Sequence, residues 1–132
     1  MADWLKMLGT TTNPMQDDWL NGVERSEIVA SRKRMSMRPG DRLVYYATGI
    51  GAVFAIATVK SFPYRKPDGE GFEWRVDTEL QQHKLFLHEG VPLEAISVGD
   101  RDLRRSIRQQ SHIRLSSAEF EAAAQALTDE AG

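Results

Sequence analysis

Residues 37–59 read MRPGDRLVYYATGIGAVFAIATV and predict two strands joined by a glycine-rich hairpin. The second strand is apolar on both faces. Val53, Ala55, Ala57 and Val59 are expected on one face, and Phe54, Ile56 and Thr58 on the other. A strand of this kind must be covered on both sides, so we expect it to be central in a barrel or a covered sheet. The small residues Ala52, Ala55 and Ala57 suit the narrow interior of a small barrel.

The rest of the chain alternates between short strands and short helices. Strands are expected at 3–8, 72–79, 84–87 and 112–115, helices at 15–20, 27–35 and from Ser116 onward, a helical turn at 103–109, a surface loop at 62–71 and a proline-containing connection at 91–96. Ser116 and Glu119 form a capping box for the last helix. We find no repeat and no second domain, so the prediction is a single α+β domain spanning residues 1–132.

Composition excludes several classes of protein. The chain has 132 residues, 41% of them hydrophobic, which is enough to bury a real core. The absence of cysteine excludes disulfides, thiol catalysis and zinc-finger spacing. No apolar run reaches the roughly 18–20 residues that span a membrane, and the first residues do not resemble a signal peptide. We therefore expect a cytoplasmic protein without a membrane partner.

The net charge of −2 conceals two basic segments. Residues 25–42 hold six Lys or Arg against two acidic residues, and residues 100–114 hold five Arg against two Asp. These local charges of +4 and +3 lie in an otherwise acidic chain. Two such patches indicate a directed electrostatic footprint for a polyanion. The alternative is that both are ordinary solvated helix faces.

Signatures of catalysis are missing from the sequence. There is no Gly-x-Ser-x-Gly elbow, Walker loop or His-Glu-x-x-His motif. His83 and His88 are five residues apart on an expected strand, so they point to opposite faces and do not easily share a metal. We expect no enzyme, no metal and no cofactor.

Two aromatic residues are expected near the surface. Trp19 lies on a short helix, and Tyr64 lies on a loop between two prolines. Such rings can stack on an unstacked base, and the alternative is that they pack against the core. Thr10, Thr11 and Asn13 could contact a base edge, or serve as turn and cap residues.

The order of these elements resembles the EVE domain family, within the PUA-like superfamily and related to YTH domains. The resemblance covers nearly the whole chain. It is carried by Trp4-Leu5, Asn21-Gly22-Val23, Met37-Arg38-Pro39-Gly40-Asp41, Ile56-Ala57-Thr58-Val59, Phe62-Pro63-Tyr64, Trp74-Arg75-Val76-Asp77, Val91-Pro92-Leu93, Arg105-Ser106-Ile107 and Leu115-Ser116. It implies a PUA-like curved β-barrel with peripheral helices. It also implies a pocket for one flipped, modified base.

The resemblance also implies which residues form that pocket. They are Thr10, Thr11 and Asn13 in the turn after the first strand, the aromatic residues Trp19 and Tyr64, Tyr46 and Ala47 at the end of the hairpin strand, and Ser106. The chain departs from the family where Leu5-Lys6-Met7-Leu8-Gly9 replaces a common Lys-Ser pair, and where Ala47-Thr48 replaces a common His-Ser. Arg32, Lys33, Arg34, Arg104 and Arg105 are the expected phosphate contacts.

The leading hypothesis is a nucleic-acid-binding module that reads a modified base in DNA or RNA. Burial of a methyl group contributes only about 0.8 kcal/mol, so recognition of a methylated base would be modest. One alternative is a small-molecule or nucleotide-binding protein that uses the same pocket. Another is a barrel that serves as a protein-interaction subunit.

Overall fold

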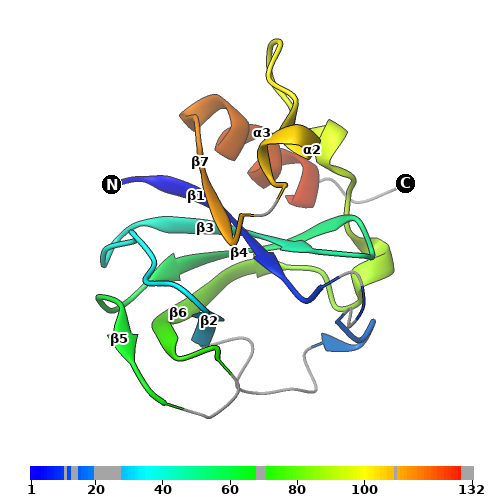
Figure 1. The fold of residues 1–132 in the computed structure, drawn as a ribbon. Coiled ribbons are helices and arrows are strands. Elements are labelled where there is room, and N and C mark those ends of the chain that lie inside the picture. The colour runs from blue at the N-terminus through cyan, green and yellow to red at the C-terminus, as the bar shows by residue number, and fades with distance from the viewer. Residues whose placement is uncertain (11, 13–14, 20–27, 68–70, 109, 129–132) are drawn as a thin grey trace.

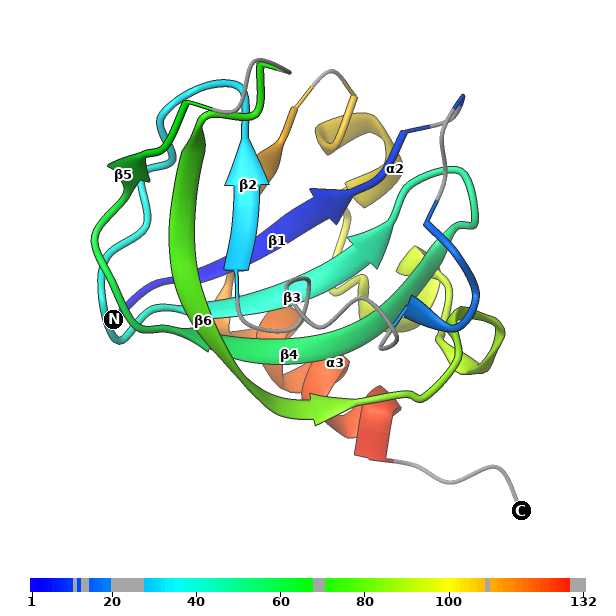
Figure 2. The same ribbon diagram turned by 90° about the horizontal axis from the view of Figure 1, so that it is seen from below.

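The computed structural model contains one strongly curled β-sheet (Figures 1 and 2). It describes residues 1–10, 12, 15–19, 28–67, 71–108 and 110–128. The strands within these residues are β1 (Asp3–Leu8), β2 (Ile28–Ser31), β3 (Arg42–Ala47), β4 (Ala52–Val59), β5 (Tyr64–Arg65), β6 (Trp74–His83) and β7 (His112–Leu115). Their order is β2-β6-β4-β3-β1-β7, with β5 paired to β6. Strands β1 and β3 are parallel, and all other pairs are antiparallel.

Within the described residues, short helices pack on both sides of the curled sheet, since Leu87 belongs to the core inside the curl whereas Leu93, Ile96 and Leu103 belong to the outer core. They are the 3-10 helices η2 (Leu87–Glu89) and η3 (Leu93–Ile96), and the α-helices α2 (Leu103–Ser106) and α3 (Ser117–Thr128). The expected capping box forms, because the Ser116 N–H donates to Glu119 and the Glu119 N–H donates to Ser116 Oγ. Phe120, Ala123 and Leu127 of α3 pack against the sheet. This is the PUA-like curved β-barrel with peripheral helices that the resemblance implied.

The central position of β4 is confirmed, since it lies between β3 and β6 with both faces buried. The expected alternation along it is wrong at its start. Tyr45 pairs with Ala55 and Tyr46 pairs with Val53, so Phe54 is an extra residue in a β-bulge. Phe54 therefore joins Ala55 in the core inside the curl, while Val53 joins the outer core beneath α3.

The predicted helix at 27–35 is wrong. Ile28 to Ser31 form strand β2, which pairs with β6, and Arg32 to Arg34 continue as bend and coil. Ile28 and Val29 are β-branched and favour this pairing. The basic residues Arg32, Lys33 and Arg34 of the predicted helix lie beyond the strand.

Three further expectations need correction. Within the predicted helix at 15–20, residues 15 and 16 are irregular, residues 17 and 18 form a turn and Trp19 has 3-10 conformation, whereas Leu20 lies outside the described residues. The predicted strand at 84–87 is a bend leading into η2, because β6 extends to His83. The predicted loop at 62–71 contains β5, which pairs with β6. The cap residue Asn13 lies outside the described residues.

Candidate functional site

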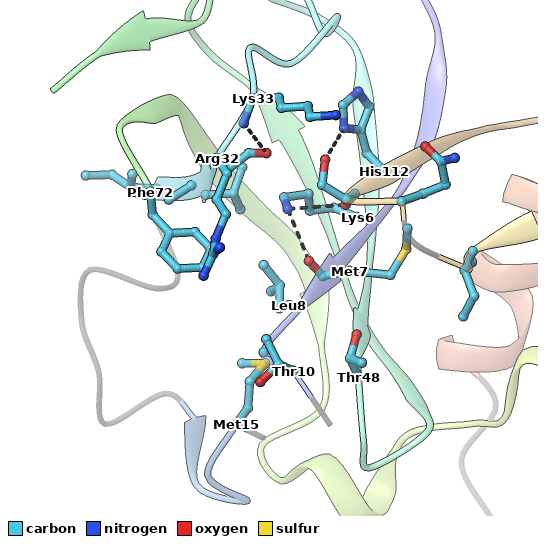
Figure 3. A pocket seen from close by; sticks show the side chains of 18 of the residues that line it. Lys6, Met7, Leu8, Thr10, Met15, Arg32, Lys33, Thr48, Phe72 and His112 are labelled. Atoms are coloured by element: carbon cyan, nitrogen blue, oxygen red, sulfur yellow. Dashed lines mark hydrogen bonds between the residues drawn. The ribbon is translucent and has the colours of Figure 1, made fainter. Parts of the chain in front are cut away.

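A cavity of about 930 Å³ opens where β1 ends and the chain leaves β2 (Figure 3). Its lining comprises residues 6–10, 15–16, 28–34, Thr48, Phe72, Ile107 and 110–112. Ligand pockets in proteins span roughly 300–1,000 Å³, so the cavity has room for a ligand of small-molecule size. The parallel pairing of β1 and β3 brings the turn after Leu8 beside Thr48, whose N–H donates to the Leu8 carbonyl.

The charge of the cavity wall has one sign. Lys6, Arg32, Lys33 and Arg34 contribute cationic side chains, and none of the described lining residues is Asp or Glu. The chain as a whole has a net charge of −2. A cleft lined by one sign of charge concentrates the field within it, so this cavity attracts anions although the protein is acidic.

Lys6 on β1 is the innermost cation, with a side chain that is 3% exposed. Its Nζ donates to the carbonyls of Met7, at 3.1 Å, and Ser111, at 3.2 Å. Burial lowers the pKa of Lys6 to about 8, because a low-dielectric interior disfavours the charged form. The Lys6 ammonium therefore lies in the cavity wall and is hydrogen-bonded to two backbone carbonyls.

His112 on β7 lies beside this lysine. Its Nδ1 is 2.8 Å from Ser111 Oγ, and its ring packs edge-on against Trp4 with centroids 5.4 Å apart. Burial, and then the charge of Lys6, lower the pKa of His112 below its ordinary value. The neutral imidazole is therefore favoured, and the wall gains a polar group that can donate or accept.

The exposed rim of the cavity is formed by Arg32, Lys33 and Arg34. The Arg32 guanidinium lies 4.8 Å from the centroid of the Phe72 ring, and that of Arg34 lies 5.7 Å from the Trp74 ring. The Lys33 N–H donates to the buried Ser31 Oγ at 3.4 Å. The Lys33 side chain extends toward His112 (Figure 3). Aromatic faces thus position two cations of the rim.

The cavity contains some of the predicted site residues. Thr10 lines it, as do Arg32, Lys33 and Arg34, so the turn after β1 and the first basic segment do meet. Thr11 and Asn13 lie outside the described residues. Tyr46 is buried in the outer core and Ala47 in the inner one. Ser106 lies on α2, where its Oγ donates to the Asp102 carbonyl. None of the last three residues lines the cavity.

The expected exposure of Trp19 is wrong, because the side chain is 1% exposed in the inner core. Its ring packs edge-on against Phe54, and its Nε1 donates to the Lys84 carbonyl at 3.0 Å. Tyr64 is half-buried on β5, and its hydroxyl donates to Asp77 at 2.7 Å. Neither ring lines the cavity.

The second basic segment reaches the cavity, but its arginines do not line it. Ile107 and residues 110–112 line the wall, whereas Arg104 and Arg105 do not. Arg104 pairs with Glu94, and Arg101 pairs with Glu119 at 2.8 Å. Acidic neighbours thus already neutralise part of this segment.

The inner residues of the cavity, which include Lys6, Thr48, Phe72 and His112, were not among the predicted site residues, although Lys6 and Thr48 lie in the two places near the expected pocket where the chain departs from the family. For Lys6 a signal was present, since it alternates with Trp4 and Leu8 on a strand whose other residues are mainly apolar. A lysine on the inward face of such a strand indicates a polar site.

Within the described ranges no three His, Asp or Glu residues gather closely enough to hold a metal ion. In the same ranges no helix is both long and apolar enough to cross a membrane.

Comparison with solved structures shows a shared fold at low sequence identity. Human THYN1, in complex with DNA containing 5-methylcytosine, is 9% identical with a TM-score of 0.65 over 99% of this chain and 100% of that one. Rpa0253 from Rhodopseudomonas palustris is 19% identical with a TM-score of 0.62 over 96% and 93%. The YTH domain of Zygosaccharomyces rouxii MRB1, with N6-methyladenosine RNA, is 9% identical with a TM-score of 0.56 over 93% and 85%.

These matches confirm, at the level of fold, the resemblance to EVE and other PUA-like domains. No family model matches the sequence, and no curated protein matches it.

Proposed function

We propose that this protein binds DNA or RNA and takes one modified base into the cavity beside Lys6. The observation that carries the proposal is a cavity of about 930 Å³ whose described charged residues are all basic. Solved proteins of the same fold that hold methylated DNA or RNA add support. A base leaves its stack at a cost of a few kcal/mol, which stacking and edge contacts in a pocket can offset.

In this proposal the rim and the interior have different tasks. Arg32, Lys33 and Arg34 contact phosphates, which supply affinity without reading sequence. Thr10 and Lys6 offer hydrogen bonds to the base edge, and Phe72 offers an aromatic face at the entrance. Arg104 and Arg105 stay predicted phosphate contacts that lie beyond the cavity.

The test is a fluorescence titration of labelled oligonucleotides at several salt concentrations. The triple variant R32A/K33A/R34A should weaken binding of every sequence and flatten the salt dependence. Each lost phosphate contact lowers the slope of log K against log[salt] by about 0.7–0.9. An R104A/R105A variant measures the second segment in the same assay.

The matched control is K60A/R65A/K66A, which removes the same positive charge from residues that do not line the cavity. It should leave the slope nearly unchanged. Equal slopes for the Arg32–Arg34 variant and the native protein would contradict the proposed role of the rim. A shallow slope in the native protein, with tight binding of a mononucleotide, would favour the small-molecule alternative.

The proposal is for a reader and not for an enzyme. The oligonucleotide should therefore be recovered chemically unchanged after prolonged incubation, as measured by mass spectrometry. Loss or transfer of the modification would contradict this part of the proposal.

The cytoplasmic location expected from the sequence also stays a prediction.

A further inference from the structure

The ammonium of Lys6 has unused capacity for hydrogen bonding at the cavity wall. An ammonium carries three N–H donors, and the recorded acceptors of Lys6 Nζ are the carbonyls of Met7 and Ser111. Figure 3 shows this ammonium beside the space enclosed by Leu8, Thr10 and Arg32. The third N–H is therefore available to a ligand that fills this space.

The positive charge of Lys6 also lacks a recorded counter-charge. No ion pair of Lys6 within 4 Å is found among the described residues, and the charged or titratable neighbours in the cavity wall are His112 and the three cations of the rim. A buried charge is costly unless a charged partner or hydrogen bonds compensate it. Two carbonyl dipoles compensate part of this charge, and an anionic oxygen would compensate the rest.

We propose that Lys6 makes the cavity selective for a base that carries an anionic oxygen, such as the carboxylate of 5-carboxycytosine, over a methylated or unmodified base. This inference rests on the proposed function and names the chemistry of its ligand. A methyl group offers Lys6 neither charge nor acceptor. A carboxylate offers both, and charge-assisted hydrogen bonds are the strong ones.

The depth of Lys6 favours a base substituent over a backbone phosphate. Lys6 is 3% exposed, whereas Arg32, Lys33 and Arg34 are exposed at the entrance. A chain that rests its phosphates on the rim presents its flipped base, and not its backbone, to the interior. A terminal phosphate carries the same anionic oxygen chemistry, so the experiment must separate these two sources.

The experiment measures the affinity of the intact protein for one short oligonucleotide with a single variable cytosine. The cytosine is unmodified, 5-methyl, 5-hydroxymethyl or 5-carboxy, and a further oligonucleotide is unmodified with a 5′-phosphate. The 5-hydroxymethyl base is the neutral control, because it carries an oxygen of similar reach. The native protein should bind the 5-carboxy form about tenfold more tightly than the 5-methyl form.

Lys6→Met should bring the ratio of the 5-carboxy to the 5-methyl affinity to about one. This ratio is the readout, because a loss of affinity common to all the oligonucleotides leaves it unchanged. Lys66→Met removes a lysine from an exposed position that does not line the cavity, so it should leave the preference intact. The comparison among oligonucleotides with native protein needs no variant, so the inference stays testable if Lys6→Met does not fold.

Four results overturn the inference. Equal affinity of the native protein for 5-methyl and 5-carboxy forms, or a preference that survives in Lys6→Met, would remove the assigned role of Lys6 but leave the proposed function standing. A gain confined to the 5′-phosphate oligonucleotide would assign the anionic oxygen to a chain end. Failure to bind any oligonucleotide would remove the proposed function itself, and this inference with it.

Discussion

At the scale of single residues, Lys6 makes the free energy of unfolding depend on pH in the alkaline range. Burial lowers its pKa from the ordinary value of 10.5 to about 8. Between these two values the unfolded chain binds one more proton than the folded protein, so the free energy of unfolding rises with pH across this window. The rise attributable to Lys6 is of the order of 3 kcal/mol.

Lys6→Met should remove this rise. Chemical denaturation of native protein and variant from pH 7 to pH 11 measures the difference between their free energies of unfolding. That difference should shift in favour of the native protein as pH rises from about 8 to about 10.5, and stay constant above. A difference that is independent of pH would mean that Lys6 is not desolvated as described.

Asp41 connects the start of the chain to the turn before β3. Its carboxylate accepts from the Ala2 N–H at 2.9 Å, from Trp4 Nε1 at 3.0 Å and from the Arg38 N–H at 3.0 Å. Burial would raise the pKa of Asp41, but these donors outweigh it and lower the pKa. Because Trp4 is buried, loss of this acceptor leaves an unsatisfied indole N–H.

Asp41→Ala should therefore lower the free energy of unfolding by about 2 kcal/mol or more. Urea denaturation measures this loss. Asp41→Asn, which keeps an oxygen acceptor, should lose less. A loss below about 0.5 kcal/mol in the alanine variant would contradict the assigned role, because that is the range of neutral surface changes.

At the scale of elements, hydrogen bonds between Asp17 and His88 attach the segment after β1 to η2. The His88 N–H and ring Nδ1 lie 2.9 and 2.7 Å from the carboxylate of Asp17, and the Leu87 N–H donates to the Asp17 carbonyl. The His88 backbone bond, together with the His88 ring, lowers the pKa of Asp17 below its ordinary value. Met15 and Gln16 of the same segment line the cavity.

Asp17→Ala should lower Tm near neutral pH, with Glu121→Ala as the control for loss of an exposed carboxylate. The stabilisation by Asp17 is fully present above the ordinary carboxyl pKa of about 4 and is lost as pH falls through the lower folded pKa. The Tm difference between native protein and variant should therefore disappear in strong acid. Thermal melts that show no Tm difference between native protein and variant at neutral pH would contradict the stabilising role of the Asp17–His88 contact.

Elements with strong local patterns could be predicted, and elements defined by distant partners could not. The apolar run of β4 and the capping box of α3 carry their own signals, and both are present. Strand β2 depends on pairing with β6, more than forty residues later. Its four residues are too few to outweigh the basic residues that follow, which suit a solvated helix equally well.

At the scale of the whole molecule, the sequence predicted the fold better than the site. A strand that is apolar on both faces must be covered on both sides, which favours a curved barrel. The order of the elements along the chain resembles one family and indicates the same fold. The cavity is assembled from segments more than a hundred residues apart, namely β1 and residues 110–112. The local charge pointed to Arg32, Lys33 and Arg34, which do line the cavity. Aromatic content alone could not show that Trp19 packs inward.

Filling the cavity tests directly whether a base enters it. Thr48 lines the wall at the end of β3. A tryptophan at this position would occupy the space of a base while leaving Arg32, Lys33 and Arg34 in place. Thr48→Val, which has nearly the same volume, is the matched control.

The measurement is the ratio of affinities for modified and unmodified oligonucleotides, with the salt slope recorded in the same titrations. The native protein and Thr48→Val should prefer a modified oligonucleotide. Thr48→Trp should reduce that ratio to about one while its salt slope is retained, because phosphate contacts lie on the rim. A folded Thr48→Trp variant that keeps the full preference would contradict the claim that the base enters this cavity.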